Sequence, residues 1–187
     1  MRRILTFVDS FDRNFSGFLA SKSQLSPRYS YYLAKTGDNL PWMAFSLFCL
    51  YYNVIFPRVE LLLILLATGV CALFNLPIKF SVKRPRPSSD NLSLYAQVDR
   101  YSFPSGHSCR MACLATITFL FFPKVGLFFF FWALFVGFAR IHMRIHYFLD
   151  VTFGALIGVF TALLIYLFSP KIAVIFDFII YNVFRYF

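Results

Sequence analysis

Charged residues are scarce in this chain of 187 residues, at 14% of the sequence, against roughly 25% in an average soluble domain. Hydrophobic residues make up 59%, and 27 Phe and 11 Tyr help to bring the aromatic share to 21%. A soluble domain of this length cannot bury so much apolar surface in one core, whereas lipid can solvate it. The composition therefore excludes a soluble protein and predicts an integral membrane protein.

Acidic residues are rarer than basic ones: 8 Asp and Glu stand against 18 Lys and Arg, for a net charge of +10. In a soluble protein this excess would indicate nucleic-acid binding. Here the basic residues flank or interrupt apolar runs, so we expect membrane lipids and a lipid phosphate as partners. We expect no nucleic acid and no obligate protein partner. Because no carboxylate cluster suits a divalent cation, we also expect no metal and no cofactor.

Cysteine is limited to four residues, and each of them lies inside an apolar segment. Buried thiols at such positions behave as small hydrophobic groups, so the sequence predicts no disulfide framework. Cys109 and Cys113 stand four residues apart beside His107, but no further ligand completes a zinc-type set.

Long apolar runs are plentiful, and a spanning helix needs on the order of 20 such residues. Five candidates are residues 40–56, 59–78, 106–122, 125–140 and 147–168. Ser169 and Pro170 are expected to end the fifth, and residues 171–187 form either a sixth spanning helix or an interfacial one. The predicted fold class is all-α: a polytopic transmembrane bundle of five to six helices, in a single domain over residues 1–187.

The first 36 residues contain no uncharged run long enough to span a membrane. Their apolar residues recur at helical spacing, which predicts an amphipathic segment lying on the bilayer surface over residues 1–36. Asp9, Asp12 and Arg13 interrupt the place where a signal peptide would have its apolar core, so a signal peptide is disfavoured.

Two polar stretches, residues 79–104 and 140–146, interrupt the apolar pattern. Helix alternation puts both on the same side of the membrane, so they are predicted to be active-site loops at one end of the bundle. Of the histidines there, His142 is interpreted as a solvated loop residue. Membrane headgroups are the expected contacts of Lys83, Arg84, Arg100 and Arg144.

Three cations near this end form a candidate phosphate site. Lys79 closes the second predicted span, Arg86 follows seven residues later, and Arg140 ends the fourth span. Converging cations bind a phosphoryl group and stabilise the charge that develops during its transfer. The backbone N–H groups around Ser105 and Gly106, at a helix start, would add an anion-binding terminus, and glycine permits close approach.

Histidines supply the reactive groups of this site. His146 and Asp150 stand one helical turn apart on the same face, so Asp150 is expected to orient the imidazole. A histidine oriented in this way is an activated nucleophile that can form a covalent intermediate. His107 can protonate the leaving oxygen as a general acid. These residue types together predict phosphoryl transfer.

The motifs Lys79-x6-Arg86-Pro87, Pro104-Ser105-Gly106-His107 and Arg140-x5-His146-x3-Asp150 resemble the three signatures of the type 2 phosphatidic acid phosphatase (PAP2) superfamily. The segment TGDNLPW at 36–42 resembles a weaker feature of its small bacterial members. The resemblance implies metal-independent hydrolysis of a lipid phosphomonoester or pyrophosphate through a phosphohistidine on His146. Ala139 replaces the serine usual in the third motif, which removes one phosphate hydrogen bond worth about 1 to 3 kcal/mol.

Alternatives remain open at this stage. A lipid-to-lipid phosphotransferase would use the same residues, whereas an anion transporter would distribute its charges over several depths. Undecaprenyl pyrophosphate, phosphatidylglycerophosphate, phosphatidic acid and the 1-phosphate of lipid A all fit the resemblance. We expect a bacterial inner-membrane protein with its site facing the periplasm, although the positive-inside rule alone favours the cytoplasm.

Overall fold

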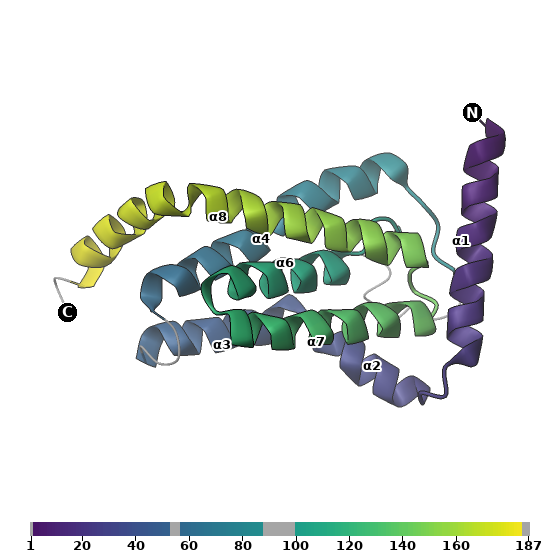
Figure 1. The fold of residues 1–187 in the computed structure, drawn as a ribbon, viewed down its shortest axis with the longest axis horizontal. Helices are drawn as coiled ribbons and strands as arrows, with labels where there is room; N and C mark the ends of the chain where they lie inside the picture. Colours follow the sequence, from purple (N-terminus) through teal and green to yellow (C-terminus); the bar gives the residue numbers. More distant parts are fainter. Residues whose placement is uncertain (1, 53–56, 88–99, 185–187) are drawn as a thin grey trace.

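The computed structural model describes residues 2–52, 57–87 and 100–184, and within these ranges the chain is helical, without strands. Figure 1 shows the helices, labelled in the order in which they occur along the chain. Their bounds are α1 Arg2–Lys22, α2 Pro27–Lys35, α3 Asn39–Tyr52, α4 Arg58–Val82, α6 Gly106–Phe121, α7 Pro123–His142 and α8 Phe148–Phe184. The predicted all-α class is confirmed.

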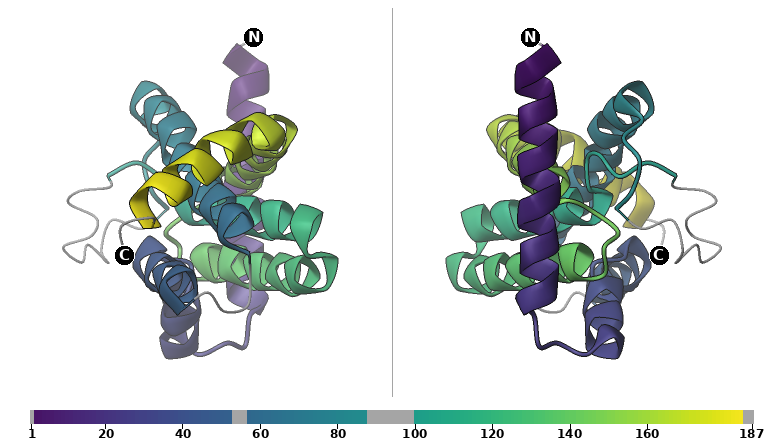
Figure 2. Two further views of the ribbon diagram at one scale, coloured as in Figure 1. Left: turned by 90° about the vertical axis from the view of Figure 1, so that its left-hand side faces the viewer. Right: turned by 90° about the vertical axis from the view of Figure 1, so that its right-hand side faces the viewer.

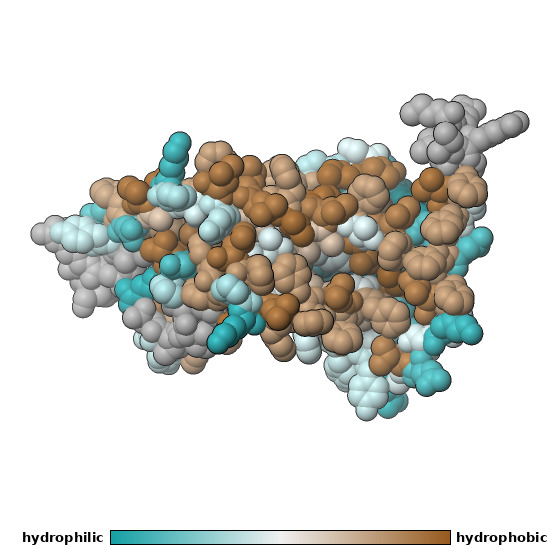
Figure 3. Space-filling view, in the orientation of Figure 1, coloured by the Kyte–Doolittle hydropathy of each residue, from teal (hydrophilic) through white to brown (hydrophobic). Residues whose placement is uncertain are grey.

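Three of the described helices are long and apolar enough to cross a membrane: α4, α7 and the part of α8 over Phe148–Phe178. The helices α3 and α6, with 14 and 16 residues, are shorter. Figure 3 shows apolar residues along most of the visible face, with hydrophilic residues gathered mainly towards its two ends. The membrane character is thus supported, whereas a count of five to six spans stays a prediction. The end of the predicted span 40–56 lies outside the described residues.

Helix α8 departs from the prediction, because it runs through Pro170 as a single helix of 37 residues. Proline at this position removes one backbone donor, which would leave the carbonyl of Tyr166 without its bond. The hydroxyl of Ser169 donates to that carbonyl over 2.7 Å and replaces the missing donor. The prediction that Ser169 and Pro170 end the helix is therefore wrong, although residues 185–187 lie outside the described part.

Helix α6 lies between the longer helices α4, α7 and α8 (Figures 1 and 2), and most of its side chains are buried. Two glycines bring α8 close to it. A Cβ atom on Gly158 would lie 2.1 Å from the carbonyl oxygen of Cys109, and one on Gly154 would lie 2.4 Å from that of Ser105. Small residues allow such close crossings of membrane helices. The same crossing lets the Ser105 N–H donate to the Asp150 carbonyl over 2.9 Å.

Gly158→Val should therefore lower the melting temperature of the purified protein in detergent. The new side chain would meet the α6 backbone, and overpacking of this kind costs about 1 to 3 kcal/mol. Gly69→Val is the matched control, because a Cβ atom at Gly69 meets no heavy atom within 4 Å. Equal melting temperatures for the two variants would show that the α6–α8 crossing does not depend on Gly158.

The amphipathic N-terminal segment forms two helices, α1 and α2, where a single segment was expected over residues 1–36. Helix α1 crosses the end of the bundle, roughly perpendicular to the long helices (Figures 1 and 2). Its outward apolar side chains include Phe7, Phe11 and Phe18, which are all more than half exposed. Asp12 and Ser16, in contrast, are buried against the bundle.

These two buried side chains of α1 cap another helix. The Leu149 N–H donates to Asp12 over 3.0 Å, and the Phe148 N–H donates to the Ser16 hydroxyl over 2.8 Å. The first N–H groups of a helix lack intrahelical acceptors, so α1 supplies the acceptors that the start of α8 needs. The surface helix is thus built into the end of the bundle that carries the motifs.

Candidate active site

One end of the bundle gathers the predicted site. Helix α4 ends there, α6 begins there, α7 ends there and α8 begins there, beside α1 (Figure 1). This arrangement follows from the alternation of helix directions along the chain. It brings together three segments that lie far apart in the sequence: the end of α4, the start of α6 and the turn between α7 and α8.

His146 lies in the turn before α8 and is 1% exposed. Its Nδ1 lies 2.7 Å from the carbonyl oxygen of Ser102. A carbonyl only accepts hydrogen bonds, so Nδ1 carries the proton and Nε2 carries the lone pair. Burial, followed by the positive charges of Arg140, Arg86 and Lys79, holds the pKa of His146 well below its usual value. The imidazole is therefore neutral at pH 7, as a nucleophile requires.

Asp150 has a different position from the one predicted. Its Oδ2 lies 3.8 Å from His146 Nδ1 and accepts the Tyr147 N–H over 2.8 Å, while its Oδ1 pairs with Arg84 at 2.7 Å. The carboxylate is drawn to the start of its own helix and to the guanidinium. His146 is oriented by the direct hydrogen bond that its Nδ1–H donates to the carbonyl of Ser102, a residue that the sequence analysis did not single out. Asp150 acts at longer range.

Arg84 is a second correction, because it was expected to contact headgroups. Its side chain is 13% exposed and forms ion pairs of 2.7 to 2.8 Å with Asp9, Asp12 and Asp150. Its guanidinium also lies 4.1 Å from the centre of the Tyr147 ring. Burial alone would lower the pKa of Arg84, but the carboxylates outweigh burial and raise it. Arg84 thus joins α1, the loop after α4 and the start of α8.

The three predicted phosphate-binding cations converge on His146. Lys79 is in the last turn of α4 and is 4% exposed, while Arg86 and Arg140 are half-buried. Each of the three lowers the pKa of His146 through its charge, and Arg140 Nη2 lies 3.4 Å from His146 Nε2. Positive charge is therefore concentrated around the nitrogen that bears the lone pair.

The start of α6 supplies backbone donors. Ser105 is the N-cap residue: its hydroxyl accepts the Ser108 N–H over 3.4 Å, and its own N–H is bonded to the Asp150 carbonyl. Ser105 thus shapes the helix start, and its own N–H is already engaged within the protein. The N–H groups of Gly106 and His107 lie in the first turn, where intrahelical acceptors are lacking, so their position suits an anion.

His107 has a partner that the sequence analysis missed. Its Nε2 lies 2.7 Å from Oδ1 of Asp38, between α2 and α3. The hydrogen bond from His107 holds the pKa of Asp38 below its usual value, so this group stays a carboxylate. The neighbouring Gly37 allows the approach, since a Cβ atom there would lie 2.7 Å from Val136 and 3.3 Å from the imidazole. The segment TGDNLPW was the available signal.

His142 does not join this set. Its Nδ1 lies 2.7 Å from the hydroxyl of Ser30, so it fixes α2 to the end of α7. Among the described residues, His, Cys, Asp and Glu form no group of three or more that could hold a metal ion. The groups gathered here, cations and free N–H donors around a neutral imidazole, are suited to an anion.

Comparison with known families identifies the class of protein. Residues 60–173 match the PAP2 superfamily, which covers the end of α4, the start of α6 and the turn before α8. The chain belongs to the PAP2 superfamily. With its three apolar helices, it is a membrane protein of that family.

One curated protein is similar to this chain over part of its length. The bacitracin transport permease protein BcrC of Bacillus licheniformis is 40% identical over 74 residues, which are 40% of this chain and 36% of that protein. The similarity therefore spans about a third of that relative.

Two solved structures share the fold. LpxE of Aquifex aeolicus has a TM-score of 0.68 at 22% identity, covering 84% of this chain and 93% of that one. A transmembrane PAP2-type phosphatidylglycerolphosphate phosphatase from Bacillus subtilis has a TM-score of 0.70 at 24% identity, covering 88% and 87%.

Proposed function

We propose that this protein is an integral-membrane phosphatase that hydrolyses a phosphomonoester or pyrophosphate of a lipid through a phosphohistidine on His146. The observation that carries the proposal is the state of His146: a buried neutral imidazole with its lone pair on Nε2, surrounded by Lys79, Arg86 and Arg140. The names of the similar proteins, a phosphatidylglycerolphosphate phosphatase among them, support a lipid phosphate as substrate.

The first chemical step transfers the phosphoryl group to the protein. His146 Nε2 attacks phosphorus, the bond to the lipid oxygen breaks, and that oxygen takes the electron pair and a proton from His107. Lys79, Arg86 and Arg140, with the N–H groups of Gly106 and His107, bind the phosphoryl oxygens and stabilise the transition state. The cations supply the positive charge that a metal would otherwise provide, so the reaction proceeds without one.

The second step releases phosphate. Water attacks the phosphohistidine, the P–N bond breaks back to His146, and His107 takes a proton from the water. Asp38, paired with Nε2 of His107, keeps that histidine in one orientation through both steps. Transfer to a second lipid would use the same groups, because His107 can take a proton from a lipid hydroxyl as well as from water. We place the protein in a bacterial inner membrane, with the site towards the periplasm.

A phosphate-release assay tests the proposal. Purified protein in detergent is given undecaprenyl pyrophosphate, phosphatidylglycerophosphate, phosphatidic acid and lipid A 1-phosphate, with and without excess EDTA. We expect inorganic phosphate from at least one lipid, at the same rate in EDTA. If EDTA stops the reaction and Mg²⁺ restores it, the metal-free account is wrong. Appearance of a second phosphorylated lipid in place of free phosphate would favour the phosphotransferase.

A further inference from the structure

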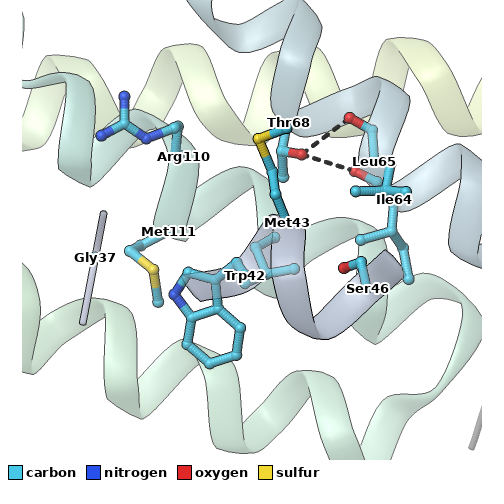
Figure 4. A pocket seen from close by; sticks show the side chains of 10 residues that line it. Gly37, Trp42, Met43, Ser46, Ile64, Leu65, Thr68, Arg110 and Met111 are labelled. Atoms are coloured by element: carbon cyan, nitrogen blue, oxygen red, sulfur yellow. Dashed lines mark hydrogen bonds between the residues drawn. The ribbon is translucent and has the colours of Figure 1, made fainter. Parts of the chain in front are cut away.

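A further basic side chain, on α6, lies next to the site and takes no part in the mechanism above. Arg110 stands one turn along α6 from Gly106, and its Nε is buried without a hydrogen-bond partner among the described residues. It borders a small hollow of about 20 Å³ between α3, α4 and α6, which Figure 4 shows from close by.

Asn75 is an independent sign of a ligand at the same place. It is 4% exposed, and its Nδ2 is buried without a hydrogen-bond partner within the described ranges. A Cβ atom on Gly106 would lie 3.6 Å from Arg110 Nη1 and 3.8 Å from Asn75 Oδ1. Both side chains therefore flank the anion-binding start of α6. A buried donor without an acceptor is costly, which indicates that an acceptor occupies this place in the working protein.

The two residues are arranged as a continuation of the site. Asn75 precedes Lys79 by one turn of α4, and Arg110 follows His107 by almost one turn of α6. Residues so spaced lie on the same face of a helix. The pair Asn75 and Arg110 thus lies one step deeper along both helices than Lys79 and His107.

We propose that Arg110 and Asn75 bind the inner phosphate of a lipid diphosphate, whose outer phosphate is the one transferred to His146. This inference rests on the proposed function and narrows its substrate class. Three cations, Lys79, Arg86 and Arg140, already surround the outer phosphoryl group. Arg110 adds a fourth positive charge at the place where a diphosphate carries additional negative charge and a monophosphate carries none.

The hollow beyond Arg110 has room for about one water molecule and not for a carbon chain. Its walls are mainly apolar, with Trp42 and Met43 from α3, Ile64 and Leu65 from α4, and Met111 and Leu114 from α6. Figure 4 shows Trp42 and Met111 on one side of this space and Ile64 and Leu65 on the other. The carbon chain of the substrate is therefore assigned to the surrounding bilayer, and only Arg110 and Asn75 to its inner phosphate.

These residues can hydrolyse a diphosphate in two steps. His146 Nε2 attacks the outer phosphorus, and the bond from that phosphorus to the bridging oxygen breaks. The bridging oxygen keeps the electron pair, so the leaving group is the lipid monophosphate. Arg110 and Asn75 donate to its oxygens, and His107 supplies the proton. Water then releases the outer phosphate from His146 as inorganic phosphate.

Farnesyl diphosphate and farnesyl monophosphate test whether Arg110 and Asn75 bind an inner phosphate, because the two substrates share one carbon chain and differ by that phosphate. We expect the wild-type protein in detergent to prefer the diphosphate. Arg110→Met should lower kcat/KM for the diphosphate by about ten- to a hundredfold, the range for a hydrogen bond to a charged group, and leave the monophosphate within about twofold. Lys124→Met, which removes one charge at the opposite end of α7, should change neither substrate.

An inhibition measurement gives a readout that does not depend on turnover of the diphosphate. Methylenediphosphonate should inhibit monophosphate hydrolysis by the wild type more strongly than methylphosphonate does, and Arg110→Met should remove this difference. Equal losses on both farnesyl substrates, or an unchanged inhibitor preference, would overturn the diphosphate site while leaving the phosphatase intact. Absence of phosphate release from every lipid in the wild type would instead overturn the proposed function itself.

Discussion

His146→Ala should reduce phosphate release to background on every substrate and abolish the phosphoprotein intermediate. Among the described residues, Lys79, Arg86 and Arg140 all act on His146, whereas His107 is engaged by Asp38, so we expect no other imidazole to take over the phosphoryl group. Loss of a nucleophile from a catalytic set costs on the order of 10⁶-fold in kcat in a well-studied protease. The measurement is rapid quenching with a ³²P-labelled lipid, followed by a test for acid-labile label on the protein.

Two controls make this result interpretable. His142→Ala removes the other histidine of the same region, which contacts Ser30 in α2 and lies outside the site. It should keep both label and turnover. The melting temperature of His146→Ala in detergent shows whether the buried site still folds. Acid-labile label that persists in folded His146→Ala would show that another residue is the nucleophile.

His107→Ala should lose far more activity on a lipid monophosphate than on an activated aryl phosphate. A lipid alkoxide is a poor leaving group and needs a proton, whereas an aryl oxide departs with little protonation. The expected difference between the two substrates is about the 10²- to 10⁴-fold contribution of general acid catalysis. His146→Ala, by comparison, should lose nearly all activity on both, because it forms the bond to phosphorus.

Asp38→Asn is the companion variant for this comparison. Asparagine has the same shape as aspartate but no charge, so the hydrogen bond that orients His107 becomes weaker while the volume of the side chain is kept. It should shift the aryl-to-lipid ratio in the same direction as His107→Ala, by a smaller factor. If His107→Ala loses equally on both substrates, this histidine binds phosphate and does not donate a proton.

The cation set and the helix-start motif could be predicted from the sequence because local rules determine them. Lys79 and Arg140 end apolar helices, Gly106 begins one, and apolar helices that alternate in direction return the polar stretches to the same end. The same rules gave the all-α class. Pro170 was misread because a nearby hydroxyl, Ser169, replaces its missing donor inside an apolar helix, and composition alone does not reveal that.

The partners of these residues could not be predicted, because they come from distant parts of the chain. Asp38 and His107 are 69 positions apart, and Arg84 and Asp9 are 75 apart. Nothing in the spacing of either pair indicates contact. A carboxylate one turn from a histidine suggested a direct bond between Asp150 and His146, but a helix start and a guanidinium compete for that carboxylate.

The way α1 crosses the bundle has a consequence for how a substrate reaches His146. Phe7, Phe11 and Phe18 of this helix point outward, whereas its acids point inward, towards Arg84 and the start of α8. We expect an amphipathic helix of this kind at the boundary between headgroups and acyl chains. Because α1 is joined to α8 two residues after His146, that boundary also fixes the level of the imidazole. The phosphate of the lipid substrate proposed above would sit at this level, so we expect the substrate to arrive by lateral diffusion within its leaflet.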